Sequence, residues 1–228
     1  MNYNLFDLFL ILFILFGGII GFKRGVIKQI VITFGIIIVL FISFNMKNSL
    51  SLLMYKTLPF FTTGILNNYS SLNIIIYELS AFLLLFSLLT TILVIFIKIS
   101  KIVEKLLRVT VILAIPSKIL GFILGIIENY LISLVFLVVL LNPTFNIKTL
   151  PDSKVSNFIL KNTPIVSIYT DKYIDSFNEI KDLLEDKNKY DDKIFNCKLQ
   201  KILINNKIVS KESIDYLIKS GKIYKKCK

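Results

Sequence analysis

Apolar residues along this chain gather into long runs instead of alternating with polar ones. As helices, runs of about 20 residues are long enough to cross a bilayer hydrocarbon core of roughly 30 Å. Four runs meet this requirement, and we expect transmembrane helices at about 5–22, 28–46, 74–97 and 118–142. The pattern therefore predicts an all-α membrane protein in which a four-transmembrane-helix bundle occupies residues 1–142.

The pattern changes at Pro143. From there to Lys228, apolar residues are interspersed with many Lys, Asp and Glu residues. Residues 169–184 have the composition of a helix, and Ser210 as N-cap with Gly221 just past the end would frame a second, short one. We therefore expect residues 143–228 to form a polar C-terminal domain or tail that is small, soluble and mostly helical.

A basic stripe follows the third apolar run. It consists of Lys98, Lys101, Lys105 and Arg108, which recur at helical spacing opposite apolar residues. One charged face and one apolar face predict an amphipathic helix lying in the membrane interface. We expect its cations to contact anionic lipid headgroups of the bilayer.

The distribution of Lys and Arg among the loops predicts the orientation. The first loop holds Lys23, Arg24 and Lys28 and the third holds the basic stripe, whereas the second has only Lys47 and Lys56. Positively charged loops stay in the cytoplasm, so both termini should lie outside a bacterial plasma membrane. The first apolar run lacks the features of a cleaved signal peptide and should be retained as a helix.

Composition narrows the function classes. The chain is 55% hydrophobic and 18% charged, with a net charge of +12 that in a membrane protein indicates lipid contact and topology, not nucleic acid. Because histidine is absent, His-based triads and His metal sites are excluded. No phosphate-binding glycine loop, serine-nucleophile motif or metal-ligand cluster occurs, so we expect a protein that is not an enzyme and needs no cofactor. Cys197 and Cys227 could be free or disulfide-bonded.

Glycines recur every four residues in two of the runs. They are Gly17, Gly21 and Gly25 in the first and Gly121 and Gly125 in the fourth. Small residues at this spacing let helix backbones approach closely in lipid. Packing within one chain is the first interpretation; self-association into a homo-oligomer and a hinge are the alternatives.

Glu128 lies near the middle of the fourth run, followed by Asn129 and Tyr130. A carboxylate at this depth is costly by a few kcal/mol, so it must face protein or water. It is either a hydrogen-bonded packing element or a proton or ion relay. Asp7 and Glu78, at the ends of their runs, should lie near the outer interface, where the cost is small.

Two stretches carry a family resemblance. Asp7 in a leading apolar run, followed by Gly-Phe-Lys-Arg-Gly at 21–25 and a second span, resembles the colicin V production protein (CvpA) family. Residues 117–125, Ser-Lys-Ile-Leu-Gly-Phe-Ile-Leu-Gly, are similar to that family's Asp-Arg-Leu-Leu-Gly-x-x-x-Gly stretch. The resemblance covers about residues 3–165. Ser117 stands where the family usually has Asp, and Glu128-Asn129 where it often has Arg-Gly.

The resemblance implies a non-enzymatic membrane protein that supports toxin production or secretion, or envelope homeostasis. In it Gly21, Arg24, Gly25, Gly121 and Gly125 would hold the bundle together. Some members carry an external serine-protease domain after the helices, but this tail is short and has no His. Two other functions stay open: a transport or channel component with Glu128 as its ion site, and an anchor that recruits an external enzyme through residues 151–228.

Overall fold

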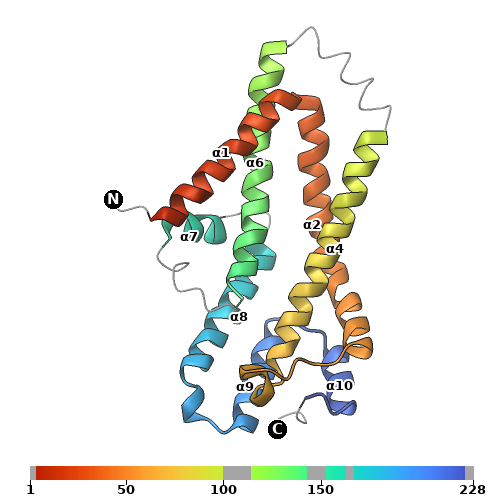
Figure 1. The fold of residues 1–228 in the computed structure, drawn as a ribbon, viewed down its shortest axis with the longest axis vertical. Helices are drawn as coiled ribbons and strands as arrows, with labels where there is room; N and C mark the ends of the chain where they lie inside the picture. The colour runs from red at the N-terminus through yellow and green to blue at the C-terminus, as the bar shows by residue number, and fades with distance from the viewer. Residues whose placement is uncertain (1–3, 100–113, 143–152, 163–166, 224–228) are drawn as a thin grey trace. The chain divides into compact units, whose positions relative to one another are not determined.

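The computed structural model describes residues 4–99, 114–142, 153–162 and 167–223, and the elements in them are helical (Figure 1). Within these ranges, four helices are long and apolar enough to cross a membrane: α1 (Leu5–Arg24), α2 (Val26–Thr57), α4 (Leu72–Ile99) and α6 (Ala114–Leu140). They coincide with the four predicted runs, which confirms the all-α membrane fold class. From residue 100 on, the predicted amphipathic helix lies outside the described residues.

Shorter helices make up the rest of the described chain. They are α3 (Ile65–Asn68), α7 (Lys154–Lys161), α8 (Ser167–Glu185), the 3₁₀ helix η2 (Lys187–Lys189), α9 (Asp192–Asn205) and α10 (Lys211–Lys219). The hydroxyl of Ser210 accepts a hydrogen bond from the backbone N–H of Ser213 at 3.0 Å, as expected for the N-cap of α10. Gly221 follows this helix with φ of 70°, the left-handed conformation of a C′ glycine.

The second helix is longer than the sequence pattern predicts. We expected a span ending at residue 46, but α2 continues through Lys47 to Thr57 and contains 32 residues. At about 1.5 Å per residue it is roughly 48 Å long, well beyond the hydrocarbon thickness. Lys47 therefore marks where the apolar stretch ends and not where the helix ends.

The chain divides into two compact units. Unit 1 contains residues 1–43, 86–138 and 147–163, and unit 2 contains residues 44–85, 139–146 and 164–228. The first part of α2 and the last part of α4 thus belong to unit 1, and the remainder of both helices belongs to unit 2. The C-terminal helices α8, α9 and α10 thus share a unit with the end of α2 and the beginning of α4.

Glycine backbones bring α1 and α6 into direct contact within unit 1. A methyl group added at Gly17 would lie 2.5 Å from the carbonyl oxygen of Gly125, and one added at Gly21 would lie 2.9 Å from the Cα of that residue. Gly121 in turn faces Gly21 so closely that its own added methyl would overlap the carbonyl group there. Lipid offers no hydrophobic driving force between helices, so close packing of this kind has to hold α1 against α6.

A single residue joins α1 to α2. Gly25 has φ of 78°, a conformation that residues with a Cβ rarely adopt, and it is the only residue between the two helices. Gly21 lies inside α1. The hydroxyl of Ser117 at the start of α6 accepts from the backbone N–H of Val26 at 3.2 Å, and so occupies one of the free donors at the beginning of α2.

Unit 2 has a mixed aromatic and aliphatic core. The rings of Tyr69, just before α4, and Phe195 in α9 have centroids 4.0 Å apart. Helices α8 and α9 pack against each other and are linked through η2. Further side chains with 1% or less of their surface exposed are Tyr55, Leu72, Ile74, Ile75, Ile180, Leu199, Leu203, Ile208, Ile214 and Leu217. The C-terminal helices thus contribute to one buried core together with the parts of α2 and α4 that belong to unit 2.

We predict that Gly21→Leu and Gly125→Leu each lower the free energy of unfolding by about 1–3 kcal/mol or more, because the new side chains would overlap backbone atoms of the facing helix. Thermal unfolding of the purified protein in detergent, followed by circular dichroism, measures the change. Thr91→Ile is the matched control, since it adds apolar bulk to an exposed position of α4. Equal destabilisation by the control would contradict the close α1–α6 contact.

Candidate functional site

A first polar cluster lies inside unit 1 where α1, α2 and α6 meet. Arg24 Nη1 donates to Glu128 Oε2 at 3.1 Å, and the Gln29 side-chain amide donates to the same oxygen. Thr33, one turn along α2, donates to the Leu124 carbonyl at 3.4 Å. We call Arg24, Gln29, Thr33 and Glu128 the Arg24–Glu128 cluster. Only 12% of the Glu128 side chain is exposed, so this intramembrane carboxylate faces protein and has a cation and an amide as partners.

Asn129 does not take part in this cluster. Its amide nitrogen donates to the carbonyl oxygen of Phe13 in α1 at 2.7 Å, and its side chain lies directly against Gly17. Consecutive residues on a helix point about 100° apart, so Glu128 and Asn129 contact different neighbours. The sequence grouped them as one polar site, whereas the structure gives Asn129 a separate contact that joins α6 to α1.

Asp7 lies in the first turn of α1 and is enclosed by protein. It has no exposed surface, a burial that its predicted position near the outer interface does not imply. It forms a capping box with Asn4, and its Oδ1 accepts from the Ser153 hydroxyl at 2.6 Å and from the Val155 backbone N–H at 2.9 Å. Ser153 is the N-cap of α7, so the carboxylate lies at that helix's positive end. Asp7 therefore fixes α7 to the start of α1.

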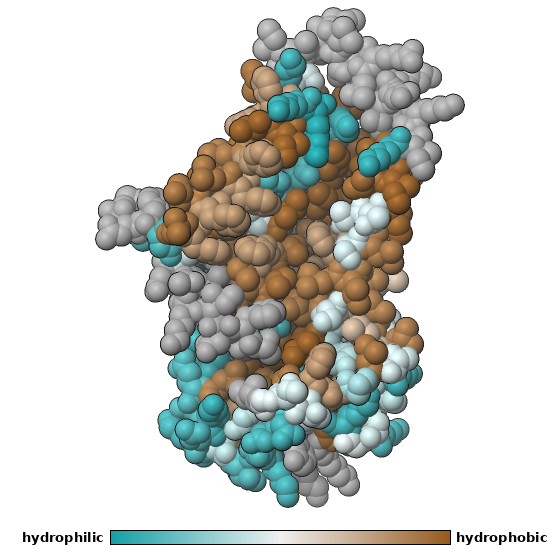
Figure 2. All heavy atoms as spheres, viewed as in Figure 1, coloured by the Kyte–Doolittle hydropathy of each residue, from teal (hydrophilic) through white to brown (hydrophobic). Residues whose placement is uncertain are grey.

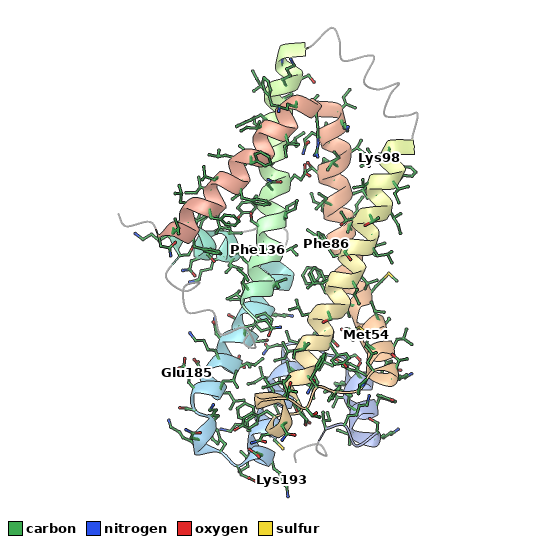
Figure 3. The ribbon with its side chains drawn as sticks, viewed as in Figure 1. Met54, Phe86, Lys98, Phe136, Glu185 and Lys193 are labelled. Carbon is green, nitrogen blue, oxygen red and sulfur yellow. The ribbon has the colours of Figure 1, made fainter. Side chains whose placement is uncertain are left out.

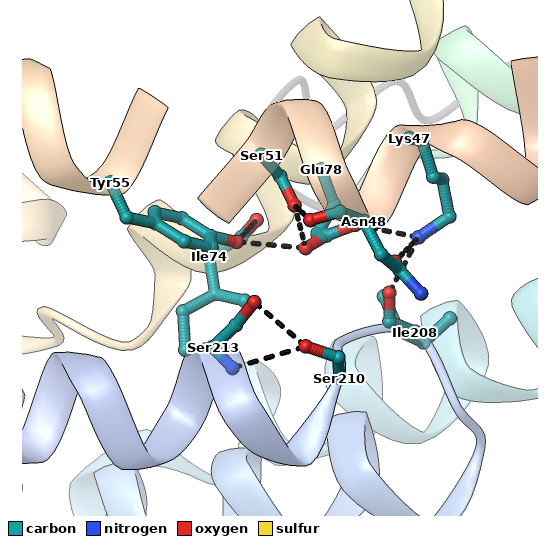
Figure 4. A network of polar contacts seen from close by, with 9 residues as sticks. All are labelled: Lys47, Asn48, Ser51, Tyr55, Ile74, Glu78, Ile208, Ser210 and Ser213. Carbon is teal, nitrogen blue, oxygen red and sulfur yellow. Dashed lines mark hydrogen bonds and ion pairs between the residues drawn. The ribbon is translucent and has the colours of Figure 1, made fainter. Parts of the chain in front are cut away.

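A second and more buried cluster lies in unit 2 (Figure 4). Lys47 in α2 and Glu78 in α4 form an ion pair with 2.6 Å between Nζ and Oε2, and their side chains are 5% and 2% exposed. Lys47 Nζ also donates to Asn48 Oδ1 at 2.8 Å and to the carbonyl oxygen of Ile208 at 2.7 Å. The buried ammonium thus has both side-chain and backbone acceptors among its partners.

The other oxygen of the carboxylate is also occupied. Glu78 Oε1 accepts from the Ser51 hydroxyl at 2.7 Å and from the Tyr55 hydroxyl at 3.0 Å (Figure 4). Ser51 and Tyr55 lie one and two turns beyond Lys47 on α2, so one helix face supplies the partners of Glu78. We call Lys47, Ser51, Tyr55, Glu78 and the Ile208 carbonyl the Lys47–Glu78 network. Protein groups therefore surround Glu78, whose predicted position near the outer interface does not by itself imply such burial.

A second lysine connects the C-terminal helices to α2 within the same unit. Lys222, just past α10, donates from Nζ to the carbonyl oxygens of Tyr55 at 2.5 Å and Leu58 at 2.7 Å. Tyr55 lies in the last turn of α2 and Leu58 directly follows the helix, where backbone acceptors lack helical partners and the helix dipole is negative. The cation of Lys222 therefore caps α2.

The beginning of α4 is held by α9. Asn196 Oδ1 accepts from the Ser71 backbone N–H at 3.0 Å, and its amide nitrogen donates to the Asn68 carbonyl at 3.0 Å. Gln200, one turn along α9, donates to the Ser71 hydroxyl at 3.2 Å. Asn196 and Gln200 are almost fully buried. Together with Lys222, these contacts make the C-terminal helices part of one packed unit with the polar ends of α2 and α4.

Few of the residues in these clusters could be found from the sequence. Lys47 and Glu78 were taken only as the limits of apolar runs, and nothing linked them, because 31 positions separate them. Among the predicted lipid-contacting residues, Lys98 lies exposed near the end of α4 (Figure 3), while Lys101, Lys105 and Arg108 lie outside the described residues.

Two further findings concern cysteine and metal chemistry. Cys197 in α9 is disulfide-bonded, and the sequence's other cysteine, Cys227, lies outside the described residues. Across the described ranges, no group of three or more His, Cys, Asp or Glu side chains is placed to hold a metal ion.

Comparison with known proteins gives a family match. A family model described as Colicin V production protein matches residues 6–164, which is more than half of the chain. Searches of curated proteins and of solved structures gave no match. The matched stretch contains the Arg24–Glu128 cluster, Asp7 and both partners of the Lys47–Glu78 ion pair.

We predict that Lys47→Met or Glu78→Gln alone lowers the free energy of unfolding by about 3–5 kcal/mol, because each leaves a buried charge without its partner. The double variant should lose less than the sum of the two, and a double-mutant cycle in detergent measures the difference.

The exposed pair of Lys189 and Asp186, 2.8 Å apart, provides the control. Lys189→Ala should leave the unfolding transition unchanged, because exposed ion pairs contribute little. Additive losses in the Lys47 and Glu78 cycle, or a single-variant effect no larger than that of Lys189→Ala, would contradict a buried pair.

Proposed function

This chain belongs to the colicin V production (CvpA) family, and we propose that it is a non-enzymatic multi-pass protein of the bacterial plasma membrane that supports toxin production or secretion, or envelope homeostasis. In this proposal it acts as a scaffold. Its C-terminal module, α8 to α10, binds a protein partner outside the cell, and the membrane helices hold that module in place.

The Lys47–Glu78 network is the observation that carries the proposal. A lysine of α2 donates to the backbone of Ile208, between α9 and α10, and Lys222 after α10 donates back to the end of α2. A tail attached only by its chain would need neither contact. Burying two charges to make such a connection is costly unless the geometry is well matched, which fits a module whose placement on its membrane helices matters.

The chief rival is a transport or channel component with Glu128 as its proton or ion site. The position of this carboxylate within an apolar helix favours that function. Its contacts favour packing instead, because Arg24 and Gln29 both donate to Oε2 and Arg24 also lies 3.4 Å from Oε1. A third possibility, an anchor for an external enzyme, is a special case of the scaffold in which the partner is that enzyme.

The orientation is part of the proposal. The basic residues around the α1–α2 link favour a cytoplasmic position for it, which would put the C-terminal module outside. The disulfide at Cys197 supports the same side, since disulfides persist in oxidising compartments and are rare in the cytoplasm.

We predict that a membrane-impermeant maleimide modifies Cys197 on intact cells only after treatment with a membrane-impermeant reductant, measured by mass spectrometry of the purified chain. A cysteine introduced as Lys23→Cys, exposed at the end of α1, is the control. It should react only after the cells are permeabilised. The reverse pattern at the two positions would overturn the proposed orientation.

The function itself is tested by complementing cells that lack the protein. Full-length chain, a chain ending after Lys161, and the Ile194→Glu and Glu128→Gln variants are compared for released toxin and for envelope permeability to a dye. Ile194 is 50% exposed on α9, so its substitution should spare the fold. We expect truncation to abolish complementation, Ile194→Glu to weaken it by several-fold, and Glu128→Gln to retain it. Loss only in a folded Glu128→Gln variant would favour the relay.

A further inference from the structure

A small apolar hollow of about 370 Å³ lies between α1 and α6 within unit 1. It is lined by Ile19 and Phe22 from the last turns of α1 and by Ile119 and Phe122 from the first turns of α6. Three of these side chains are more than 40% exposed: Ile19, Phe22 and Ile119. In a transmembrane pair of helices this groove opens toward lipid, and water is not its natural occupant.

The close approach of the two helices shapes the groove. Gly18 has no side chain, and a methyl group there would lie 2.7 Å from a ring atom of Phe122. The ring of Phe122 therefore packs directly onto the backbone of α1. Ile19, Phe22 and Ile119 line the apolar groove beside this ring.

Positive charge lies at the groove itself. Lys118 Nζ is 5.7 Å from the centroid of the Phe22 ring, which is one of the groove walls. Lys23, next to Phe22 and in the last turn of α1, is exposed. Figure 2 shows hydrophilic side chains gathered beside the apolar surface where α1 ends. The basic residues of α1 and α6 lie at this end of the two helices, so the cations beside the groove are at the level of lipid headgroups.

The choice of occupant follows from the energetics of a lipid environment. An acyl chain gains no hydrophobic free energy by leaving other acyl chains for this groove, because both surroundings are equally apolar. Shape alone would then favour one phospholipid over another only weakly. A cation fixed beside the groove distinguishes headgroups, since it attracts an anionic phosphate ester and gains little from a zwitterionic one.

We propose that the groove between α1 and α6 binds one anionic diacyl phospholipid, with an acyl chain against Phe22, Ile119 and Phe122 and the headgroup phosphate at Lys118. Lys23 adds a second positive charge to the same headgroup. The bound lipid covers the α1–α6 contact on its exposed side.

Photocrosslinking of the full chain in phosphatidylcholine nanodiscs tests this site. The discs contain a trace of phospholipid with a diazirine on its acyl chain, carrying either a phosphatidylglycerol or a phosphatidylcholine headgroup. We expect the anionic probe to label the peptides around Phe22 and Ile119 several-fold more than the zwitterionic probe does. Lys118→Gln should remove most of this excess, and Ile119→Trp should reduce labelling by filling the groove.

Lys98→Gln is the matched control, because it removes an equally exposed cation at the end of α4 without touching the groove. It should leave the excess unchanged. Thermal unfolding of each variant verifies that the fold is kept. Equal labelling by the two probes, or an excess that depends on Lys98 and not on Lys118, would overturn the proposal.

Discussion

The ammonium of Lys47 and the carboxylate of Glu78 have lost nearly all contact with solvent, and much of unit 2 is arranged to compensate them. Taking both charges out of water costs several kcal/mol each, which is recovered only if the remaining hydrogen-bonding positions are filled. Ser51 and Tyr55 supply donors to the carboxylate, and the Ile208 carbonyl supplies an acceptor to the ammonium. The ion pair is therefore stable only if the segment between α9 and α10 packs against α2 at Lys47.

Different interactions hold the helices together in the two units. In unit 1 the backbones of α1 and α6 touch through glycines, and the attraction is van der Waals packing with the Arg24–Glu128 cluster beside it. In unit 2, polar and aromatic groups carry the contacts between α9 and the segment that leads into α4, such as Tyr69 with Phe195 and Ser71 with Asn196. Close backbone packing through glycines is effective in lipid, whereas polar and aromatic contacts are typical of packing between helices in water.

The sequence predicted the long helices well, because an uninterrupted apolar run leaves the backbone no alternative to a helix in lipid. The glycine spacing at Gly17, Gly21, Gly121 and Gly125 also pointed to the faces that the structure brings together. The extension of α2 beyond Lys47 could not be predicted, since a lysine at the end of an apolar run has the same appearance whether it meets lipid headgroups or a buried glutamate.

Partners far apart in the chain explain the other differences. Asp7 is buried because Ser153 and Val155 return to it across almost 150 positions, and no local periodicity records that contact. Likewise, no local periodicity indicates that Lys222 donates to the backbone carbonyls of Tyr55 and Leu58 near the end of α2. Arg24 and Glu128 are both singled out by the sequence, Arg24 as a motif residue and Glu128 as a separate polar site. Their pairing could not be predicted, because nothing local determines which carboxylate an arginine contacts.

The lysines of unit 2 bind main-chain atoms, and this has a consequence for how the protein can change over evolutionary time. Lys47 donates to the carbonyl oxygen of residue 208, and Lys222 donates to those of residues 55 and 58. Any amino acid at position 208 would present the same oxygen, so this hydrogen bond sets no requirement on the side chain there; the packing of the buried Ile208 side chain is what restricts it. Contacts between two side chains often lead to correlated substitutions within a family. The hydrogen bond from Lys47 to a backbone carbonyl would not produce them.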